Sequence, residues 1–273
     1  MLMAAIEQQG HQLIRVDVRD ESFSLASMPT TLAACDAVII RTIASSQAKY
    51  VARFLTHHGL TVVNAPSVID ACEDKIATSL ALADAGVPTP RTEVAFTVET
   101  ALDTMESFGY PCVLKPVIGS WGRLLAKIDS RDAAEAILEH KSTLGHYEHR
   151  VFYIQEFVAK PGGDIRVVTI DGTPIAAMTR EADHWVTNAA KGATVTARPI
   201  DDELGVTASR ASHAVGGGLL GVDIMETGDG YTVHEVNHGV EFRALDGVVD
   251  IDVPGAIVEW LESLVSEPVV MGG

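Results

Sequence analysis

The sequence predicts an α/β protein whose parts are α+β subdomains, and two observations carry this prediction. Strand-like and helix-like segments alternate over the first 85 residues, which is typical of a small, mostly parallel sheet. Beyond the break at Gly86–Pro90 ("GVPTP"), apolar runs flank turn sequences such as Asp171-Gly172 and Gly228-Asp229-Gly230. Such turns between apolar runs indicate hairpins, and hence antiparallel pairing in the later part of the chain.

The helices and strands are assigned from apolar periodicity and from the Gly and Pro residues that interrupt it. The first part is predicted to contain a helix over Met1–Gly10, strands over Gln12–Val18 and Ala37–Arg41, a helix over Ser46–His58, a strand over Leu60–Asn64 and a helix over Ser67–Ala85. The middle part is predicted to contain a helix over Val98–Phe108, strands over Tyr110–Leu114 and Leu124–Ile128, a helix over Arg131–His140 and a strand over Phe152–Phe157. The last part is predicted to contain strands over Asp164–Ile170 and Pro174–Arg180, a helix over Asp202–Val215, strands over Gly221–Glu226 and Tyr231–Asn237, and a helix over Gly255–Val265.

Composition limits the classes of function. The 273 residues are 47% hydrophobic, which suits a sizeable core. No apolar run reaches the ~18 residues of a membrane span. A net charge of −17 argues against binding nucleic acid or an anionic membrane, and fits either an ordinary acidic enzyme or adaptation to a salty cytosol. Three widely spaced cysteines predict reduced thiols in a cytoplasmic protein.

A glycine pattern in the last part is not a dinucleotide site. Gly216, Gly218 and Gly221 match G-x-G-x-x-G, but a dinucleotide fingerprint follows a strand and opens a helix. Here the glycines follow a predicted helix and lead into a strand. They are therefore expected to end that helix and form a tight turn.

The strongest local signal for chemistry lies in the predicted hairpin "GVDIMETGDGYTVHEVN". Glu235 and Asn237 are two residues apart on one strand and so share a face. With a three-residue turn at Gly228–Gly230, Thr227 pairs with Tyr231 and Asp223 lies opposite Glu235. Two carboxylates and an amide oxygen suit Mg²⁺. The alternative is a solvated polar face of an edge hairpin.

Cations and a glycine loop complete a candidate phosphate site. Lys75 lies at a predicted helix start, Lys115 ends a strand, and Lys127 lies on the returning strand. Glycines in the Gly119–Gly122 loop allow backbone N–H groups to approach phosphate oxygens. Arg123, which closes this loop, suits a phosphate or a substrate carboxylate. Each lysine alone is equally compatible with a surface charge.

Together, five motifs resemble the RimK-like branch of the ATP-grasp superfamily over essentially the whole chain. They are Asp74-Lys75, "VLKPVIGSWGR" at Val113–Arg123, "IQEFV" at Ile154–Val158, "GGDIRV" at Gly162–Val167, and the "VDIME…VHEVN" hairpin. Within that branch, the chain is similar to ligases that load an amino-group carrier protein in lysine and arginine biosynthesis. The resemblance implies an ATP-grasp fold with an N-terminal pre-ATP-grasp domain over residues 1–72, a central subdomain over 73–157 and a C-terminal subdomain over 158–273. Since the chain opens with a helix where such a domain opens with a strand, that first domain is expected to be truncated.

The resemblance also implies roles for individual residues. ATP is expected between the second and third subdomains, bound by Lys75, Lys115, Gly119, Ser120, Gly122, Lys127, Gln155, Glu156, Phe157, Val158 and Asp164. One or two Mg²⁺ ions are expected on Asp223, Glu235 and Asn237. Arg166 and Arg180 are expected beside the reacting groups as catalytic residues. The substrates are expected to contact Arg123, Asn188, Lys191, Gly239, Val240 and Glu241, whereas His184 and Trp185 suit a packing role equally well.

The implied reaction joins a carboxylate and an amine. The side-chain carboxylate of the C-terminal Glu of a small acidic carrier protein attacks the γ-phosphate of ATP, and an amine then displaces phosphate from the acyl phosphate. The amine is the α-amino group of glutamate or 2-aminoadipate, and Gly239-Val240 resembles the glutamate-using type. The alternatives are glutamate addition to a ribosomal protein tail or a coenzyme tail, and a regulatory module that binds nucleotide without turnover. Relatives of this kind often form dimers or tetramers.

Overall fold

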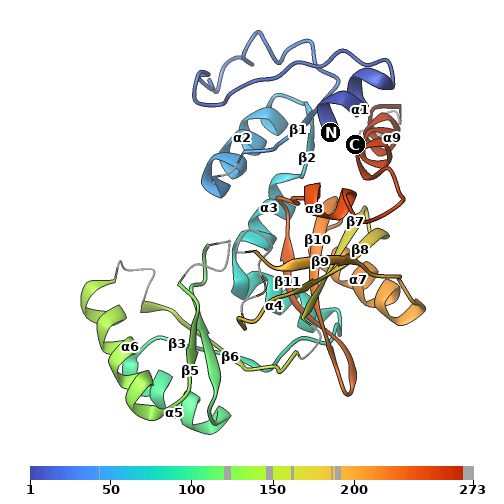
Figure 1. Cartoon of the computed structure of the whole chain (residues 1–273). Helices are drawn as coiled ribbons and strands as arrows, with labels where there is room; N and C mark the ends of the chain where they lie inside the picture. Colours follow the sequence, from blue (N-terminus) through green and yellow to red (C-terminus); the bar gives the residue numbers. More distant parts are fainter. Residues whose placement is uncertain are drawn as a thin grey trace.

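A computed structural model of the chain describes residues 1–42, 44–119, 124–145, 150–160, 163–185, 187 and 192–266. These residues form a two-stranded, a four-stranded and a five-stranded sheet, one after another along the chain (Figure 1). None of the described helices has the length and apolarity needed to cross a bilayer.

The first sheet is small and parallel, as predicted. Strands β1 (Ala37–Ile39) and β2 (Thr61–Val63) pair in parallel, and helix α2 (Ser45–His57) connects them. Helix α1 (Leu2–Gln8) contacts helix α9 (Val253–Ser266), so the first and last described helices lie side by side (Figure 1).

The strand predicted over Gln12–Val18 is wrong. The segment crosses the N-terminal region without joining a sheet. Among the described residues, the backbone of Gln12–Val16 forms no hydrogen bond with a neighbouring strand. A strand requires such a ladder, which the sequence of one segment cannot supply.

The four-stranded sheet has the order β3-β6-β4-β5 and is antiparallel throughout. Its strands are β3 (Thr92–Ala95), β4 (Cys112–Lys115), β5 (Ala126–Ile128) and β6 (Phe152–Glu156). Helices α5 (Val98–Phe108) and α6 (Arg131–Leu144) pack on this sheet through buried residues such as Met105 and Leu138. Strand β3 was not predicted, because its four residues follow a Pro-rich break and alternate only weakly.

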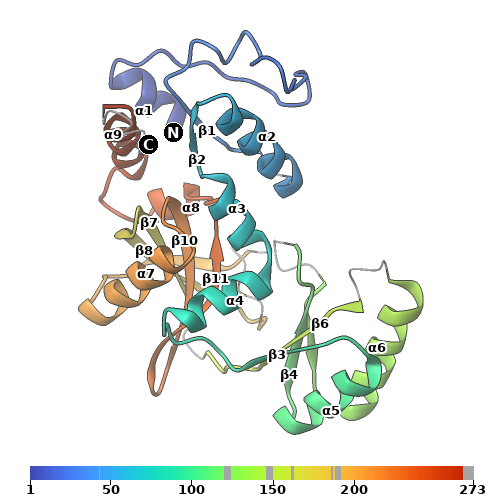
Figure 2. The same ribbon diagram turned by 180° about the vertical axis from the view of Figure 1, so that it is seen from behind.

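The five-stranded sheet has the order β11-β10-β7-β8-β9 and is also antiparallel. Its strands are β7 (Asp164–Ile170), β8 (Thr173–Glu181), β9 (Thr194–Ala197), β10 (Leu219–Thr227) and β11 (Gly230–Asn237). Helices α3 (Pro66–Glu73), α4 (Lys75–Asp84) and α7 (Asp202–Ala214) lie against one face (Figure 2). The other face packs on α9 and the short helix α8 (Arg243–Asp246). β9 and α8 were not predicted, since four-residue elements carry little periodicity.

The helix predicted over Ser67–Ala85 is two helices. Helix α3 (Pro66–Glu73) ends at Asp74, which has extended backbone angles, and helix α4 (Lys75–Asp84) begins directly after it. The Asp74 carboxylate accepts hydrogen bonds from the backbone N–H groups of Ile76 and Ala77, a typical N-cap. The break allows Asp74 to form a β-bridge with Ile118.

Asn64 joins the N-terminal region to the five-stranded sheet. This buried side chain accepts a hydrogen bond from Leu219 N–H at 2.7 Å. Its amide nitrogen donates to the carbonyls of Leu219 and His238, both at 2.8 Å. The glycines before β10 turn the chain as predicted, and a Cβ on Gly218 would lie 2.4 Å from Asn64 Oδ1. The close approach therefore requires glycine at 218.

Candidate active site

The β10–β11 hairpin places Asp223 opposite Glu235, as predicted, but by a different route. The turn has two residues rather than three, since Thr227 pairs with Gly230 and Glu226 with Tyr231. The predicted three-residue turn is therefore wrong. A β-bulge between Asp223 and Ile224 inserts His234 as an extra residue and restores the pairing of Asp223 with Glu235.

Asp223 is the centre of a buried ion-pair network. Its Oδ1 accepts from Arg166 Nε at 2.5 Å and from Arg180 Nη2 at 2.8 Å. Its Oδ2 accepts from Arg166 Nη2 at 2.7 Å and from Asn237 Nδ2 at 3.2 Å. Burial raises the pKa of this carboxyl, but the two guanidinium groups outweigh burial and hold the pKa below its ordinary value. Asp223 is therefore a carboxylate.

The network extends through Arg180 to Asp164. Arg180 Nε donates to Asp164 Oδ1 at 2.7 Å, so this buried guanidinium bridges two buried carboxylates. Lys160 Nζ donates to Asp164 Oδ2 at 3.0 Å and to Thr187 Oγ1 at 2.6 Å, and Thr187 also donates to Asp164. Burial lowers the pKa of Arg180, but the carboxylates of Asp223 and Asp164 raise it by a larger amount, so the side chain stays charged. Arg166 and Arg180, the predicted catalytic residues, thus share one carboxylate.

Lys75, at the start of α4, and Lys115, at the end of β4, also lie close to the hairpin. Lys75 Nζ lies 3.4 Å from Glu235 Oε1 and donates to the Gly119 carbonyl at 2.6 Å. Lys115, at the end of β4, is 3% exposed, and its Nζ lies 3.2 Å from His234 Nδ1. Two predicted phosphate-binding lysines and the predicted metal ligands therefore meet between the four-stranded and five-stranded sheets.

Burial sets the protonation of the Lys115–His234 pair. Burial lowers the pKa of Lys115 to about 7; Glu235 and Asp223 oppose this, while Lys75 and Lys160 add to it. Burial, and after it Lys115, also holds the pKa of His234 well below its ordinary value. His234 is therefore a neutral imidazole, and below pH 7 its Nδ1 accepts a hydrogen bond from the protonated Lys115.

Gln155 and Glu156, which the family resemblance implies as ATP contacts, form the end of β6. Gln155 is buried in mid-strand, where its amide donates to Thr92 Oγ1 at 3.0 Å and to Tyr153 Oη at 3.1 Å. Glu156 accepts from the backbone N–H of Arg91 at 2.7 Å. The Gln155 amide nitrogen is thus engaged within the sheet, whereas Glu156 is exposed.

Beyond β6, an aromatic and a lysine lie together. Lys127 Nζ is 4.8 Å from the centre of the Phe157 ring and 3.0 Å from Asp129 Oδ1. The Phe157 ring also meets Trp185 edge-on, with the ring centres 6.3 Å apart. Val158 follows, half-buried. Lys127 therefore contacts an aromatic ring and a carboxylate, and it takes no part in the ion pair between Lys75 and Glu235.

The residues at the hairpin fit a hard cation. Asp223, Glu235 and Asn237 all carry oxygen donors, and their strands are paired at these positions. Four N–H donors occupy the acceptor positions of Asp223, so a cation can bind this carboxylate only if one of them leaves, and the contact with Asn237 is the longest. Reversing the Asn237 amide would turn this donor into an oxygen ligand. Glu235 has 26% of its side chain exposed and so is open to a ligand.

Other predicted site residues have separate placements. Ser120, Gly122, Arg123, Asn188 and Lys191 lie outside the described residues. The Val240 side chain is buried in the core, and its carbonyl accepts from Arg41 Nη1 at 2.5 Å. Gly239 has open space around its Cα, and Glu241 is exposed and accepts from Arg243 N–H at 2.9 Å. Only backbone atoms of Val240 can therefore contact a substrate.

No role was predicted for His234, Lys160 or Thr187. A signal for His234 was present, because His234 and Glu235 are consecutive polar residues. Strict alternation would point His234 to the face opposite the Glu235 carboxylate. Lys160 lies four residues before Asp164, a spacing that predicts a contact on a helix but not in a loop. Thr187 meets Asp164 only through the tertiary fold.

Comparison with known proteins agrees with this architecture. A family model of the RimK-like ATP-grasp domain matches residues 72–261, and one of the LysX preATP-grasp domain matches residues 1–71. The crystal structure of a RimK domain protein ATP-grasp from Sphaerobacter thermophilus superposes with a TM-score of 0.81 and 30% identity, covering 95% of this chain and 93% of that one.

Two curated relatives cover most of the chain. It is 37% identical to the alpha-aminoadipate--LysW ligase LysX of Saccharolobus solfataricus over 82% of this chain and 82% of that protein. It is 30% identical to the glutamate--LysW ligase ArgX of Sulfurisphaera tokodaii over 96% of this chain and 93% of that protein.

Lys115 ends a strand of the four-stranded sheet, Lys75 begins helix α4, and both lie close to the hairpin of the five-stranded sheet that carries Asp223 and Glu235. With the family match, this arrangement defines a protein of the ATP-grasp class, whose members use ATP, typically with Mg²⁺. Within this class, the chain belongs to the RimK-like family.

Proposed function

We propose that this protein is an ATP-dependent ligase that forms an amide bond on an amino-group carrier protein. The α-amino group of glutamate or 2-aminoadipate is joined to the side-chain carboxylate of the carrier's C-terminal Glu. The observation that carries this proposal is the meeting of Lys75 and Lys115 with the Asp223–Glu235 pair between two sheets. Phosphate groups and a cation need this combination of charges.

ATP with one or two Mg²⁺ ions, when bound, supplies the phosphoryl group that activates the carboxylate. Asp223, Glu235 and Asn237 hold the metal, and Lys75 and Lys115 hold the phosphates. The remaining residues proposed to contact nucleotide are Gly119, Ser120, Gly122, Lys127, Gln155, Glu156, Phe157, Val158 and Asp164. Those proposed to contact the carrier or the amino acid are Arg123, Asn188, Lys191, Gly239, Val240 and Glu241.

The chain's own residues orient charge during the reaction. Arg166 and Arg180 lie on the Asp223 carboxylate, and their guanidinium groups suit a substrate carboxylate and the oxygens of the transferred phosphoryl group. Arg180 is locked between Asp164 and Asp223, so it needs no reorganisation when charge develops beside it. Thus the protein is proposed to act by positioning and electrostatics, without a covalent protein nucleophile.

The carrier and amino acid are proposed from two supports. The named relatives act on LysW, and each takes an acidic amino acid according to its name. In a chain of net charge −17, the candidate site gathers more cations than carboxylates, which favours entry of an acidic carrier tail here over the rest of the surface. The cations are Lys75, Lys115, Lys160, Arg166 and Arg180, and the carboxylates are Asp164, Asp223 and Glu235.

Glutamate is proposed as the preferred amino acid, with 2-aminoadipate as a second substrate. The basis is Gly239-Val240, directly after the metal ligands, where Gly239 leaves open space. One methylene is worth only about 1–3 kcal/mol in an apolar pocket, so the cation that meets the distal carboxylate must decide the preference. Comparing kcat/KM for the two amino acids tests this choice, and a clear preference for 2-aminoadipate would reverse it.

The proposed function is tested by ADP release from the purified protein. A carrier ligase releases ADP only when carrier and amino acid are both present, and the carrier's mass then rises by the amino acid less one water. ADP release with glutamate and a ribosomal protein tail or a coenzyme tail, but not with the carrier, would support the alternative acceptors. ATP binding without turnover under all conditions would instead indicate a regulatory module.

A further inference from the structure

The two parallel strands of the N-terminal region end against the segment that follows the proposed metal ligands. Asn64, directly after β2, donates to the His238 carbonyl at 2.8 Å. Arg41, two residues after β1, donates from Nη1 to the Val240 carbonyl at 2.5 Å. Ligands of open parallel sheets bind beyond the carboxyl ends of the strands. Residues 238–240 therefore lie at the ligand-binding end of this small sheet.

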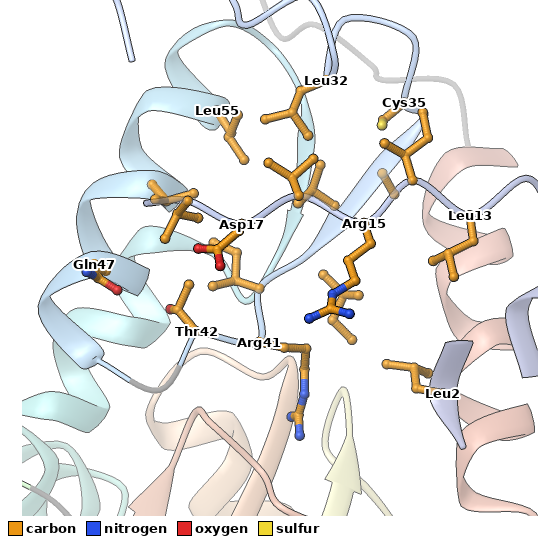
Figure 3. Close-up of a pocket in the computed structure, with 18 of the residues that line it drawn as sticks. Leu2, Leu13, Arg15, Asp17, Leu32, Cys35, Arg41, Thr42, Gln47 and Leu55 are labelled. Atoms are coloured by element: carbon orange, nitrogen blue, oxygen red, sulfur yellow. The ribbon is translucent and has the colours of Figure 1, made fainter. Parts of the chain in front are cut away.

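Arg41 carries a positive charge to this segment. Figure 3 shows its side chain at one end of a cavity of about 1440 Å³, pointing away from Leu32 and Leu55 on the far side. The guanidinium carbon lies 5.2 Å from the centre of the Phe242 ring. Burial lowers the pKa of Arg41 and Glu241 opposes this effect, but an arginine in a protein keeps its proton. The group is therefore a cation beside Val240 and Phe242.

Most of the Arg41 guanidinium is open to a ligand. It has five N–H donors in a planar fork, the residue is exposed, and within the described part of the chain its hydrogen bond goes to the Val240 carbonyl. No carboxylate among the described residues forms an ion pair with it, whereas Lys49 and Arg53 of the same region are both paired with Asp70. A free guanidinium fork suits a carboxylate.

The space beside Gly239 needs a cation from another element if an acidic side chain is to bind there. Gly239 has no atom within 4 Å of the place where a Cβ would stand, and the Val240 side chain is buried. Neither residue can pair with a carboxylate. Arg41 is held on the Val240 carbonyl, so its free donors have a set position relative to this open space.

We propose that Arg41 is the specificity-determining residue that binds the distal carboxylate of the amino acid. The amino acid lies beside Gly239, with its α-amino group toward Asn237 and its distal carboxylate on the free donors of Arg41. Glutamate and 2-aminoadipate share their α-amino and α-carboxylate groups, so a contact at the distal end is needed to distinguish them. This inference rests on the proposed ligase function and adds to it the cation that reads the length of the side chain.

Amino-acid binding to the purified protein tests this role. Calorimetry is done with Mg²⁺ and a non-hydrolysable ATP analogue present, using glutamate, 2-aminoadipate and glutamine, the neutral isostere of glutamate. Arg41→Gln should weaken glutamate binding by about tenfold or more, because a charged hydrogen bond is lost, and should leave glutamine binding unchanged. Arg41→Lys keeps the charge on a side chain that ends closer to the backbone. It should shift the preference from glutamate toward the longer 2-aminoadipate.

Arg210→Gln is the matched control. Arg210 is also exposed and donates to main-chain carbonyls, those of Ala85 and Gly86, but it lies on α7 at the opposite face of the five-stranded sheet. This variant should bind glutamate as the native protein does, which would support the assignment of the effect to Arg41.

Three results would overturn the assignment. They are native glutamate affinity in Arg41→Gln, equal weakening of glutamate and glutamine in that variant, and absence of glutamate binding to the native protein. Failure of the proposed ligase function has a different signature. Glutamate binding that depends on Arg41, without ADP release when the carrier is added, would support the role of Arg41 and count against the ligase.

Discussion

Lys115 and His234 meet between two sheets, with Nζ of the lysine 3.2 Å from Nδ1 of the histidine. Lys115 ends β4, and His234 is the extra residue of the bulge in β11. The bulge thus restores the alignment of Asp223 with Glu235 and also aims an acceptor at a buried ammonium. An unpaired ammonium in this place would carry a large desolvation cost.

His234 is expected to position Lys115 for a phosphate. His234→Leu removes the acceptor and should raise the KM for ATP by about tenfold, the equivalent of one hydrogen bond to a charged group, with a smaller change in kcat. His234→Asn keeps a side-chain acceptor and should recover most of this loss. If the Leu and Asn variants have the same KM for ATP at equal melting temperatures, His234 does not act through its hydrogen bond.

ATP affinity is expected to depend on pH through Lys115. The pKa of this lysine in the free protein is about 7, and a phosphate binds its protonated form. Binding is therefore strongest below pH 7 and weakens as pH rises, by at most about tenfold per unit. Calorimetry between pH 7 and 9 should show this decline in the native protein. The Lys115→Met variant should bind weakly with a flat profile, and an equally steep profile in it would place the titrating group elsewhere.

The two carboxylates of the proposed metal site are expected to differ in their effect on stability. Glu235→Gln should reduce ligation by about 100-fold or more while the melting temperature stays close to native, because Glu235 is partly exposed. Asp223→Asn should reduce ligation as well, and it should lower the free energy of unfolding by about 3 kcal/mol, because Arg166 and Arg180 lose a buried partner. Thermal unfolding without ligands makes the comparison. Equal stability of the two variants would show that the Asp223 network contributes little to the fold.

The N-cap at Asp74 is expected to matter for nucleotide binding. Asp74→Ala removes the hydrogen bonds to Ile76 and Ala77 and should cost about 1 kcal/mol of stability, and it should also weaken ATP binding because Lys75 begins the capped helix. Thr97→Ala removes the N-cap of α5, far from this site in the sequence, and is the matched control. It should lose similar stability with unchanged ATP affinity. Weaker ATP binding in both variants would mean that the effect is global.

The sequence determined by itself the elements that carry strong local signals. Helix α5 has its predicted bounds, and the alternation of Val222, Ile224 and Val233 located β10 and β11. The candidate residues on the hairpin followed from the two-residue period of a strand, which is a local property. The order of the motifs was sufficient to indicate the family, because motifs can be recognised in the sequence without knowing which strands pair.

Only the tertiary structure decided which groups face each other. The bulge was not predicted, because strand pairing and tertiary contacts decide it and the side-chain pattern does not; in the structure the bulged residue His234 lies 3.2 Å from Lys115. It could not show that Asp223 is shared by Arg166 and Arg180, which come from different strands. It also predicted a strand at Gln12–Val18 from side-chain pattern alone, whereas a strand exists only when a second backbone supplies its hydrogen bonds.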